Sequence, residues 1–172
     1  MRIAQNTIMS ILAVAMSVAA FTASAKDDKW QLIQALKVSP TQAVSIATAE
    51  AKGEAIELDL EFDDARAYYE IEIQGVANKY EIKVDADSGK ILNNRVENDY
   101  YKDKNRHSVN VSMQEAIKTA EDETKARVKE VDLKDRDDKN SYYEIETVNA
   151  DGKYKLKIDA NTGEVLKVKD DK

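Results

Sequence analysis

The sequence predicts an α+β fold of two repeated units, each with one helix packed on a three-stranded antiparallel sheet. Residues 80–92, YEIKVDADSGKIL, recur almost unchanged at 154–166 as YKLKIDANTGEVL. Ahead of both copies, apolar residues recur first with the spacing of a helix and then with the two-residue period of strands. The length suits one domain or two small ones, and two small units would gain stability from packing together.

The first 25 residues have the composition of an export signal. Arg2 gives a basic start, residues 8–20 are apolar apart from two serines, and Ala23-Ser24-Ala25 offers the small residues that a signal peptidase accepts. The apolar run is about a dozen residues, shorter than the roughly 20 needed to span a bilayer. We therefore expect cleavage after Ala25 and a periplasmic or secreted protein. An uncleaved N-terminal anchor is the alternative.

A helix is expected at the start of each repeat. The stretches Ser39-Pro40-Thr41-Gln42 and Ser112-Met113-Gln114-Glu115 place Ser three residues before Gln or Glu, the spacing of a capping box. Alanine-rich apolar faces follow over residues 40–52 and 113–125. Gly53 is expected just beyond the first helix, because glycine takes a positive φ without steric cost.

Three strands are expected after each helix, where apolar residues alternate with charged ones. The alternating stretches are 56–62, 69–73 and 80–84 in the first repeat and 131–133, 143–145 and 154–158 in the second. Asp85-Ala-Asp-Ser-Gly89 and Asp159-Ala-Asn-Thr-Gly163 then predict a tight turn and a short returning segment. A calcium loop of the EF-hand type needs glycine at position 6 and Glu at position 12, and both stretches fail that test.

The expected organisation follows from the repeat. Residues 1–25 are the signal peptide, 26–37 a short helix, 38–96 the first repeat, 97–108 a polar connector and 109–172 the second repeat. In the short helix, Trp30, Ile33 and Leu36 have the spacing to dock on one of the units.

The composition excludes several functions. The formal net charge is −7, and removal of the signal with Arg2 makes the chain one unit more negative. Such a surface repels the phosphates of nucleic acids and of anionic lipid headgroups, so we expect neither as a partner. No second apolar stretch is long enough for a membrane span, so we expect no stable membrane insertion after signal cleavage. The chain has no cysteine, and its one histidine, His107, lies in the connector. No nucleophile, zinc or phosphate-binding motif is present, so we predict no catalytic residues, no metal ligands and no cofactor.

Acidic residues cluster on the predicted outer faces of the strands: Glu57, Asp59, Glu61, Glu70, Glu72, Glu144 and Glu146. The simplest interpretation is a solvated sheet face, with cross-strand pairing to lysines of the neighbouring strand. The alternative is that these faces attract a divalent cation or a basic partner.

Tyr68 and Tyr142 are the candidate partner-binding residues. Each precedes a core-facing tyrosine in the second strand of its repeat, so both are expected on the outer face at matching positions. Exposed aromatic residues often anchor protein interfaces. A cross-strand packing contact, or a contact between the two units, is the alternative role.

Together these motifs resemble tandem PepSY domains. The resemblance lies in the capped alanine-rich helix, the strand Tyr-Tyr-Glu-Ile-Glu at 68–72 and 142–146, and the endings at 80–92 and 154–166. It implies a helix and antiparallel strands, no catalytic residues, and an occurrence in propeptides of secreted metallopeptidases and in small exported proteins. Because the chain contains no peptidase domain of its own, a propeptide role in cis is not expected.

We therefore predict a non-enzymatic exported binding or regulatory protein. Its expected partner is a protein, and the resemblance points to an extracytoplasmic peptidase that is inhibited or modulated. The alternative is a soluble periplasmic accessory or sensor module that binds a small ligand or a divalent cation through its acidic sheet faces.

Overall fold

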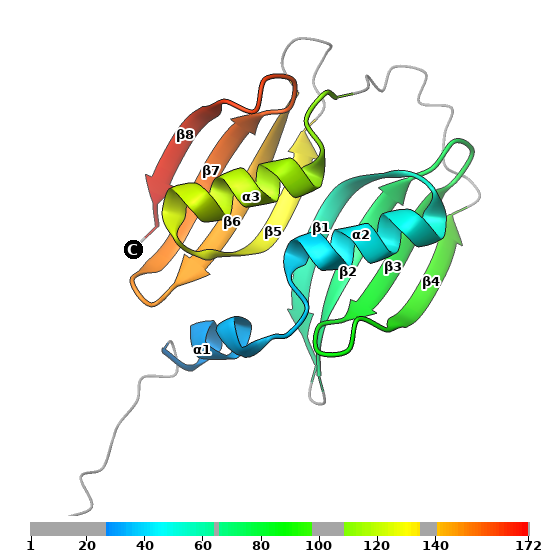
Figure 1. Ribbon diagram of the computed structural model, residues 1–172, viewed down its shortest axis with the longest axis horizontal. Helices are drawn as coiled ribbons and strands as arrows, with labels where there is room; N and C mark the ends of the chain where they lie inside the picture. Colours follow the sequence, from blue (N-terminus) through cyan, green and yellow to red (C-terminus); the bar gives the residue numbers. More distant parts are fainter. Residues whose placement is uncertain (1–26, 64–65, 98–108, 135–140, 172) are drawn as a thin grey trace, which may run out of the picture.

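The computed structural model describes residues 27–63, 66–97, 109–134 and 141–171 (Figure 1). The predicted signal peptide lies outside the described residues, as do Lys26, most of the predicted connector and His107. The described chain has three helices: α1 (Asp27–Ala35), α2 (Pro40–Ala51) and α3 (Met113–Thr124).

The described residues contain eight strands, which form one continuous antiparallel sheet in the order β4-β3-β2-β1-β5-β6-β7-β8. The strands of the first repeat are β1 (Glu54–Phe62), β2 (Ala67–Gln74), β3 (Lys79–Asp85) and β4 (Ile91–Glu97). Those of the second are β5 (Arg127–Lys134), β6 (Tyr142–Asn149), β7 (Gly152–Asp159) and β8 (Val165–Asp170). The repeats meet where β1 runs antiparallel to β5, with Leu58 opposite Val131. We call this junction the seam.

The α+β class is confirmed, but the prediction of three strands per repeat is one strand short. The segment after each Asp-Gly turn continues as a full strand, β4 or β8. These strands lie at the ends of the sheet, and most of their side chains are exposed. Because an edge strand beyond the reach of the helix has no buried face, its residues need not alternate. The period-two signal is therefore weak in both.

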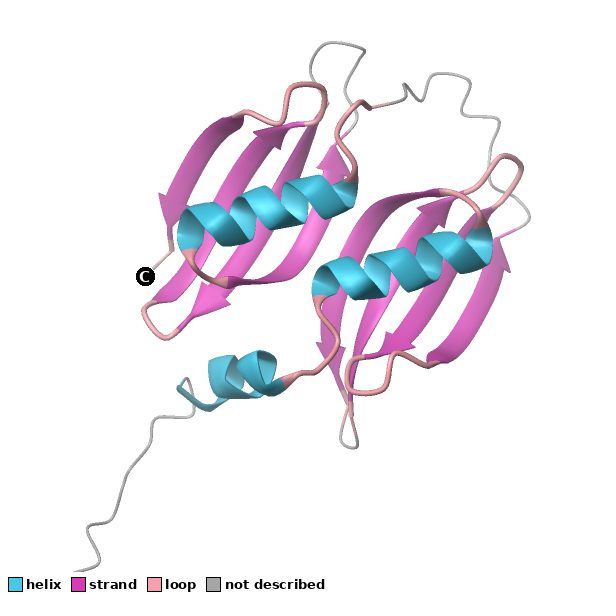
Figure 2. Ribbon diagram, viewed as in Figure 1, coloured by secondary structure: helices cyan, strands magenta, loops and turns pink. Residues whose placement is uncertain are grey.

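The molecule has two layers, with α2 and α3 on one face of the sheet (Figure 2). α2 covers β1–β3 and α3 covers β5–β7. Both helices bury their apolar faces against the sheet through the alanines Ala43, Ala47, Ala116 and Ala120. The small side chains let each helix lie close to the strands. Of the three residues expected to dock, Ile33 of α1 is buried in this core and Leu36 packs against it, whereas Trp30 is half-buried.

Both helices begin at the predicted capping boxes. The backbone N–H of Gln42 donates to the Ser39 hydroxyl at 3.1 Å, and Ser39 N–H donates to the Gln42 side chain at 2.8 Å. Ser112 and Glu115 make the same exchange in α3. The expected role of Gly53 is wrong, because the left-handed residue that ends α2 is Lys52, with φ 52°.

Gly53 is required for another reason. A Cβ atom there would lie 2.4 Å from the carbonyl oxygen of Gln74 and 2.7 Å from Cγ2 of Ile73. The backbone at the start of β1 therefore passes too close to the end of β2 for any side chain.

A buried tyrosine fixes the start of each helix to the sheet. The Tyr69 hydroxyl donates to the carbonyl oxygen of Val38 at 2.9 Å, and Tyr143 donates to that of Val111 at 2.8 Å. Each acceptor immediately precedes a helix N-cap. The phenol therefore joins the second strand of each repeat to the residue that precedes the helix cap.

One arginine crosses from the second repeat to the first. Arg127, at the start of β5, donates from Nη2 to the Val38 carbonyl at 2.6 Å and to the Tyr69 hydroxyl at 3.2 Å. The matching position in the first repeat is Glu54, whose carboxylate cannot donate such bonds. The link between the repeats is thus one-sided.

The repeated Asp-Gly stretches form turns, as predicted. The Asp85 carboxylate accepts from Ser88 N–H at 2.7 Å, and Asp159 accepts from Thr162 N–H at 2.8 Å. Gly89 and Gly163 close the turns with φ of 71° and 75°. These hydrogen bonds hold the pKa of both aspartates below the usual range, Asp85 mainly through Ser88 and Asp159 mainly through backbone N–H groups.

Candidate binding surface

The sheet leaves two kinds of surface for a partner. One is the open face, opposite α2 and α3 (Figure 2). The others are the outer edges of β4 and β8, along which no strand of the described chain pairs. The unpaired backbone groups of an edge strand can accept an additional strand.

Carboxylates line the middle of the open face. At the seam, Glu57 stands directly opposite Asp132, and Asp59 stands opposite Glu130. Partial burial, with repulsion from Glu72, Asp132 and Asp59, raises the pKa of Glu57 to about 7. Burial, with repulsion from Glu130 and Glu61 that Lys129 partly offsets, raises the pKa of Asp59 to about 6. Like charges face each other where the two repeats join.

Lysines flank this acidic seam and pair with glutamates of the adjoining strands, as the sequence predicted. The cross-strand pairs are Lys79–Glu72 at 2.6 Å, Lys83–Glu70 at 2.6 Å, Lys153–Glu146 at 2.8 Å and Lys157–Glu144 at 2.9 Å. Surface ion pairs each contribute about 0.2–1 kcal/mol to stability. The side chains thus partly neutralise one another across each half of the sheet.

Tyr68 and Tyr142 lie on the open face at matching positions, both half-buried. The ammonium nitrogen of Lys83 lies 5.0 Å from the centre of the Tyr68 ring, and that of Lys157 lies 4.4 Å from the centre of the Tyr142 ring. Lys157 also donates to the Tyr142 hydroxyl at 3.2 Å. Both rings therefore take part in cross-strand packing, and their role in partner binding stays a prediction.

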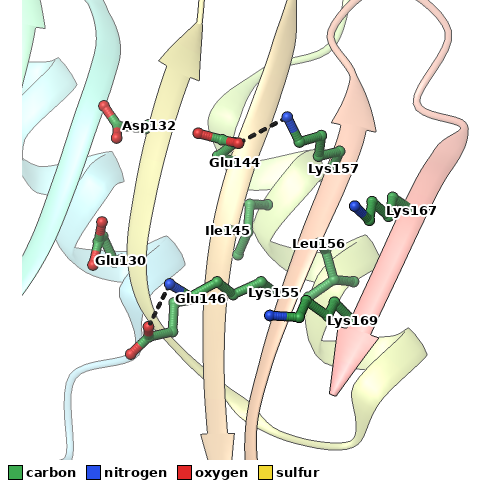
Figure 3. Close-up of a pocket in the computed structure, with 10 residues that line it drawn as sticks. All are labelled: Glu130, Asp132, Glu144, Ile145, Glu146, Lys155, Leu156, Lys157, Lys167 and Lys169. Carbon is green, nitrogen blue, oxygen red and sulfur yellow. Dashed lines mark ion pairs between the residues drawn. The ribbon is translucent and has the colours of Figure 1, made fainter. Parts of the chain in front are cut away.

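A hollow of about 260 Å³ lies on the open face of the second repeat (Figure 3). Glu130, Asp132, Glu144 and Glu146 line it from β5 and β6. Lys155, Lys157, Lys167 and Lys169 line it from β7 and β8. One wall of this hollow is acidic and the other basic. The sequence contained the signal for the basic wall, because Lys155 and Lys167 replace Glu81 and Asn93 at the matching positions of the first repeat.

Apolar side chains are exposed along both outer edges. On β4 these are Ile91, Leu92 and Val96, and on β8 they are Leu166 and Val168, with exposed fractions of 38–54%. Val168 faces the helix layer, because it stands opposite the buried Leu156. The pattern of the sequence gave no reason to single out these residues, since the edge strands were not predicted.

Within the described ranges, no three or more His, Asp or Glu side chains are arranged to hold a metal ion. None of the described helices is both long enough and apolar enough to cross a membrane. The chemistry that remains on these surfaces is charge, exposed apolar area and free backbone hydrogen-bonding groups.

Comparison with known proteins gives two structural neighbours. A candidate lipoprotein from Clostridium difficile 630 is 27% identical, with 78% of this chain and 93% of that chain covered and a TM-score of 0.49. The Bacillus megaterium YpeB C-terminal domain is 15% identical, with 78% and 66% covered and a TM-score of 0.33. No curated protein matches the sequence.

The family comparison covers both repeats. Residues 37–95 and 110–169 each match the PepSY family, described as the peptidase propeptide and YPEB domain. Each match runs from just before a helix cap into the edge strand of its repeat. The protein therefore belongs to the PepSY family and carries two PepSY domains in tandem.

Proposed function

We propose that this protein is an exported, non-enzymatic binding protein that modulates an extracytoplasmic peptidase. The family supports the choice of partner, since its description names peptidase propeptides. The described surface offers exposed strand edges and a charged sheet face, which suit recognition of a polypeptide.

The observation that carries the proposal is the pair of edge strands, along whose outer sides no strand of the described residues pairs. β4 and β8 close the two ends of the sheet with exposed apolar side chains on each. An extended segment of a peptidase can add to such an edge through backbone hydrogen bonds, while the exposed side chains select its sequence. Binding in this way would hold the segment outside the catalytic cleft or keep it from its folded position.

The test titrates the purified chain from Lys26 into secreted metallopeptidases and follows cleavage of a chromogenic peptide. We expect peptidase activity to change in a saturable way. The variants Asn94→Pro and Val168→Pro remove an outward-facing N–H from β4 and β8, respectively, without breaking the ladder to the neighbouring strand, so each tests one edge. Asn94→Pro also removes the hydrogen bond from the Asn94 side chain to Glu50. Unchanged activity at saturating protein would contradict the proposal.

The second candidate is a module that binds a small ligand or divalent cation at the seam. Its support is that Glu57 stands opposite Asp132 and Asp59 stands opposite Glu130. A bound cation would relieve the repulsion between these carboxylates. A rise in melting temperature with millimolar Ca²⁺ or Zn²⁺ that Glu57→Gln abolishes would favour this candidate over the first.

A further inference from the structure

The outermost two strands of the second repeat carry four lysines on the open face, whereas the matching positions of the first repeat hold two basic residues, Lys83 and Arg95. Across β7 and β8, Lys155 stands directly opposite Lys169, and Lys157 stands opposite Lys167. Like charges placed directly across an antiparallel pair destabilise it. In the first repeat the same places hold Glu81 opposite Arg95, which form an ion pair, and Lys83 opposite Asn93. The fold therefore does not require the lysine pairs.

Lys157 pairs with Glu144 at 2.9 Å, but the other three lysines are weakly neutralised. Lys167 has no carboxylate partner among the described residues, and Lys155 lies 3.9 Å from Glu146 and 4.0 Å from Asp171. Lys169 pairs only with the exposed Asp171, at 3.3 Å. Lysines on an edge strand can serve merely to prevent aggregation, but Lys155 is on β7, inside the edge. A positive patch on a protein of net charge −7 is a surface for an anionic partner.

The edge of β8 adds two further requirements for that partner. The N–H of Asp171 donates inward to the Lys153 carbonyl at 2.8 Å. Because the direction alternates along a strand, the N–H and C=O groups of Val168 point outward from the sheet. Val168, 45% exposed, and Leu166, 54% exposed, supply apolar surface at the same edge.

We propose that β8 binds an extended acidic segment of a partner protein as a ninth strand of the sheet. The segment has acidic residues at alternate positions, facing Lys167 and Lys169 on the open face, and an apolar residue between them on the side of Val168. This inference rests on the proposed function and specifies which edge binds and which sequence it selects.

The occupant follows from all three features together. Phosphate polymers and anionic lipids would satisfy the lysines, but they would leave the outward N–H and C=O groups of Val168 without a partner strand. A second copy of this chain paired through β8 would place Lys167 and Lys169 against their own counterparts. Pairing with β4 of another copy would place them beside Asn93, Arg95 and Glu97, a row that offers one carboxylate and one further positive charge. An acidic polypeptide in extended conformation satisfies the charge, the backbone and the apolar surface.

The experiment measures fluorescence anisotropy of a labelled peptide of about nine residues with alternating Glu and Val, long enough to span an ordinary strand. We expect saturable binding that weakens with salt. The double variant Lys155→Glu with Lys167→Asn gives the second repeat the residues of the first, and should weaken binding at least tenfold. The matched double variant Glu81→Lys with Asn93→Lys should create a second site at β4 and raise the stoichiometry to two peptides per chain.

Val168→Pro separates strand addition from simple charge attraction, because it leaves every lysine in place. We expect this variant to lose peptide binding while its melting temperature stays within a few degrees of the wild type. The inference would be overturned by any of three results. Val168→Pro binds the peptide as tightly as the wild type does, or the wild type binds a Lys-Val peptide equally well. The third result is that the wild type binds polyphosphate, or vesicles rich in phosphatidylglycerol, more tightly than the peptide. If the peptide binds at β8 but no peptidase is affected, the site stands and the proposed function fails. If a peptidase is modulated equally by wild type and Val168→Pro, the function stands and this site is wrong.

Discussion

The two repeats share their internal frame and differ in the strands farthest from the seam. In both, a capped helix lies over three strands, and Tyr69 or Tyr143 donates to the carbonyl that precedes the cap. On the outer two strands, Glu81–Arg95 in the first repeat becomes Lys155–Lys169 in the second. The residues that hold the fold are repeated, whereas those that face outward at the edge have diverged. The comparison suggests that the frame is structural and that the second edge is specialised.

The largest effect on stability is expected just before the first strand of each repeat, where the first repeat has Gly53 and the second has Ala126. Gly53→Ala would place a Cβ against the Gln74 carbonyl and should cost about 3 kcal/mol of folding free energy, at the upper end for overpacking. The second repeat has Ala126 at this position, so Ala126→Gly should cost only about 1 kcal/mol, mainly through chain entropy. Urea unfolding of both variants measures the two costs. If both variants lose the same free energy of unfolding, the close approach between Gly53 and Gln74 does not affect stability.

The next effect concerns the one-sided link between the repeats. Arg127→Ala removes two hydrogen bonds from the Val38 carbonyl and the Tyr69 hydroxyl and should cost about 2 kcal/mol. Glu54→Ala at the matching position should cost less than 1 kcal/mol, the range of an ordinary surface substitution. Chemical denaturation followed by tyrosine fluorescence measures both. A larger loss from Glu54→Ala would mean that Arg127 is not the residue that couples the repeats.

A third effect comes from the like charges at the seam. The pKa of Glu57 is raised to about 7 and that of Asp59 to about 6, so the folded state favours their protonated forms. The protonated carboxyl groups of Glu57 and Asp59 therefore stabilise the folded state. This contribution is complete below the pKa values of the unfolded chain and is lost as the pH rises through about 6 to 7. Acidification from pH 8 to pH 5.5 should therefore raise the melting temperature by roughly 2–4 °C.

Glu57→Gln should remove most of this pH dependence and raise the melting temperature at pH 8. The control is Glu144→Gln, because Glu144 on the same face is paired with Lys157. If the melting temperature of the wild type decreases when the pH is lowered from 8 to 5.5, the carboxylates are not in contact across the seam.

The smallest effect should be the same in both repeats. Lys52 and Lys125 end their helices with φ of 52° and 53°, a conformation that glycine adopts at lower cost. Lys52→Gly and Lys125→Gly should each stabilise the protein by about 0.5–1 kcal/mol. Thermal unfolding measures the gain. If only one of the two variants is more stable than the wild type, the two helix ends differ in energy although their dihedral angles are nearly the same.

Local patterns predicted the helices and the buried strands, because the signals for both depend on residues that are close together in the sequence. The capping box at Ser39 needs only a residue three positions later, and the alternation over 56–62 needs only one buried face. β4 and β8 were missed because strands exposed on both faces have no required period. The pairing of Leu58 with Val131 was also not foreseen, since no residue in either strand marks it as a junction.

The candidate surface was predicted only in part. Tyr68 and Tyr142 do lie on the open face at matching positions, but Lys83 and Lys157 lie over their rings. The lysine row of β7 and β8 depends on which residues stand across from each other, and this register follows from the turn and the bulge in the ladder. Comparison of the two copies already showed Glu81 replaced by Lys155, but not that Lys155 would face Lys169.

The central claim is that the repeats form one sheet whose only free edges, within the described chain, are those of β4 and β8. Residue-resolved hydrogen exchange tests this claim most directly. We predict that all backbone amides of Glu57–Asp59 and Glu130–Asp132 exchange slowly, whereas on β8 Lys167 and Lys169 are slow and Val168 is fast. If every second amide of both seam segments exchanges as fast as that of Val168, then β1 and β5 are open edges, and the continuous sheet is contradicted.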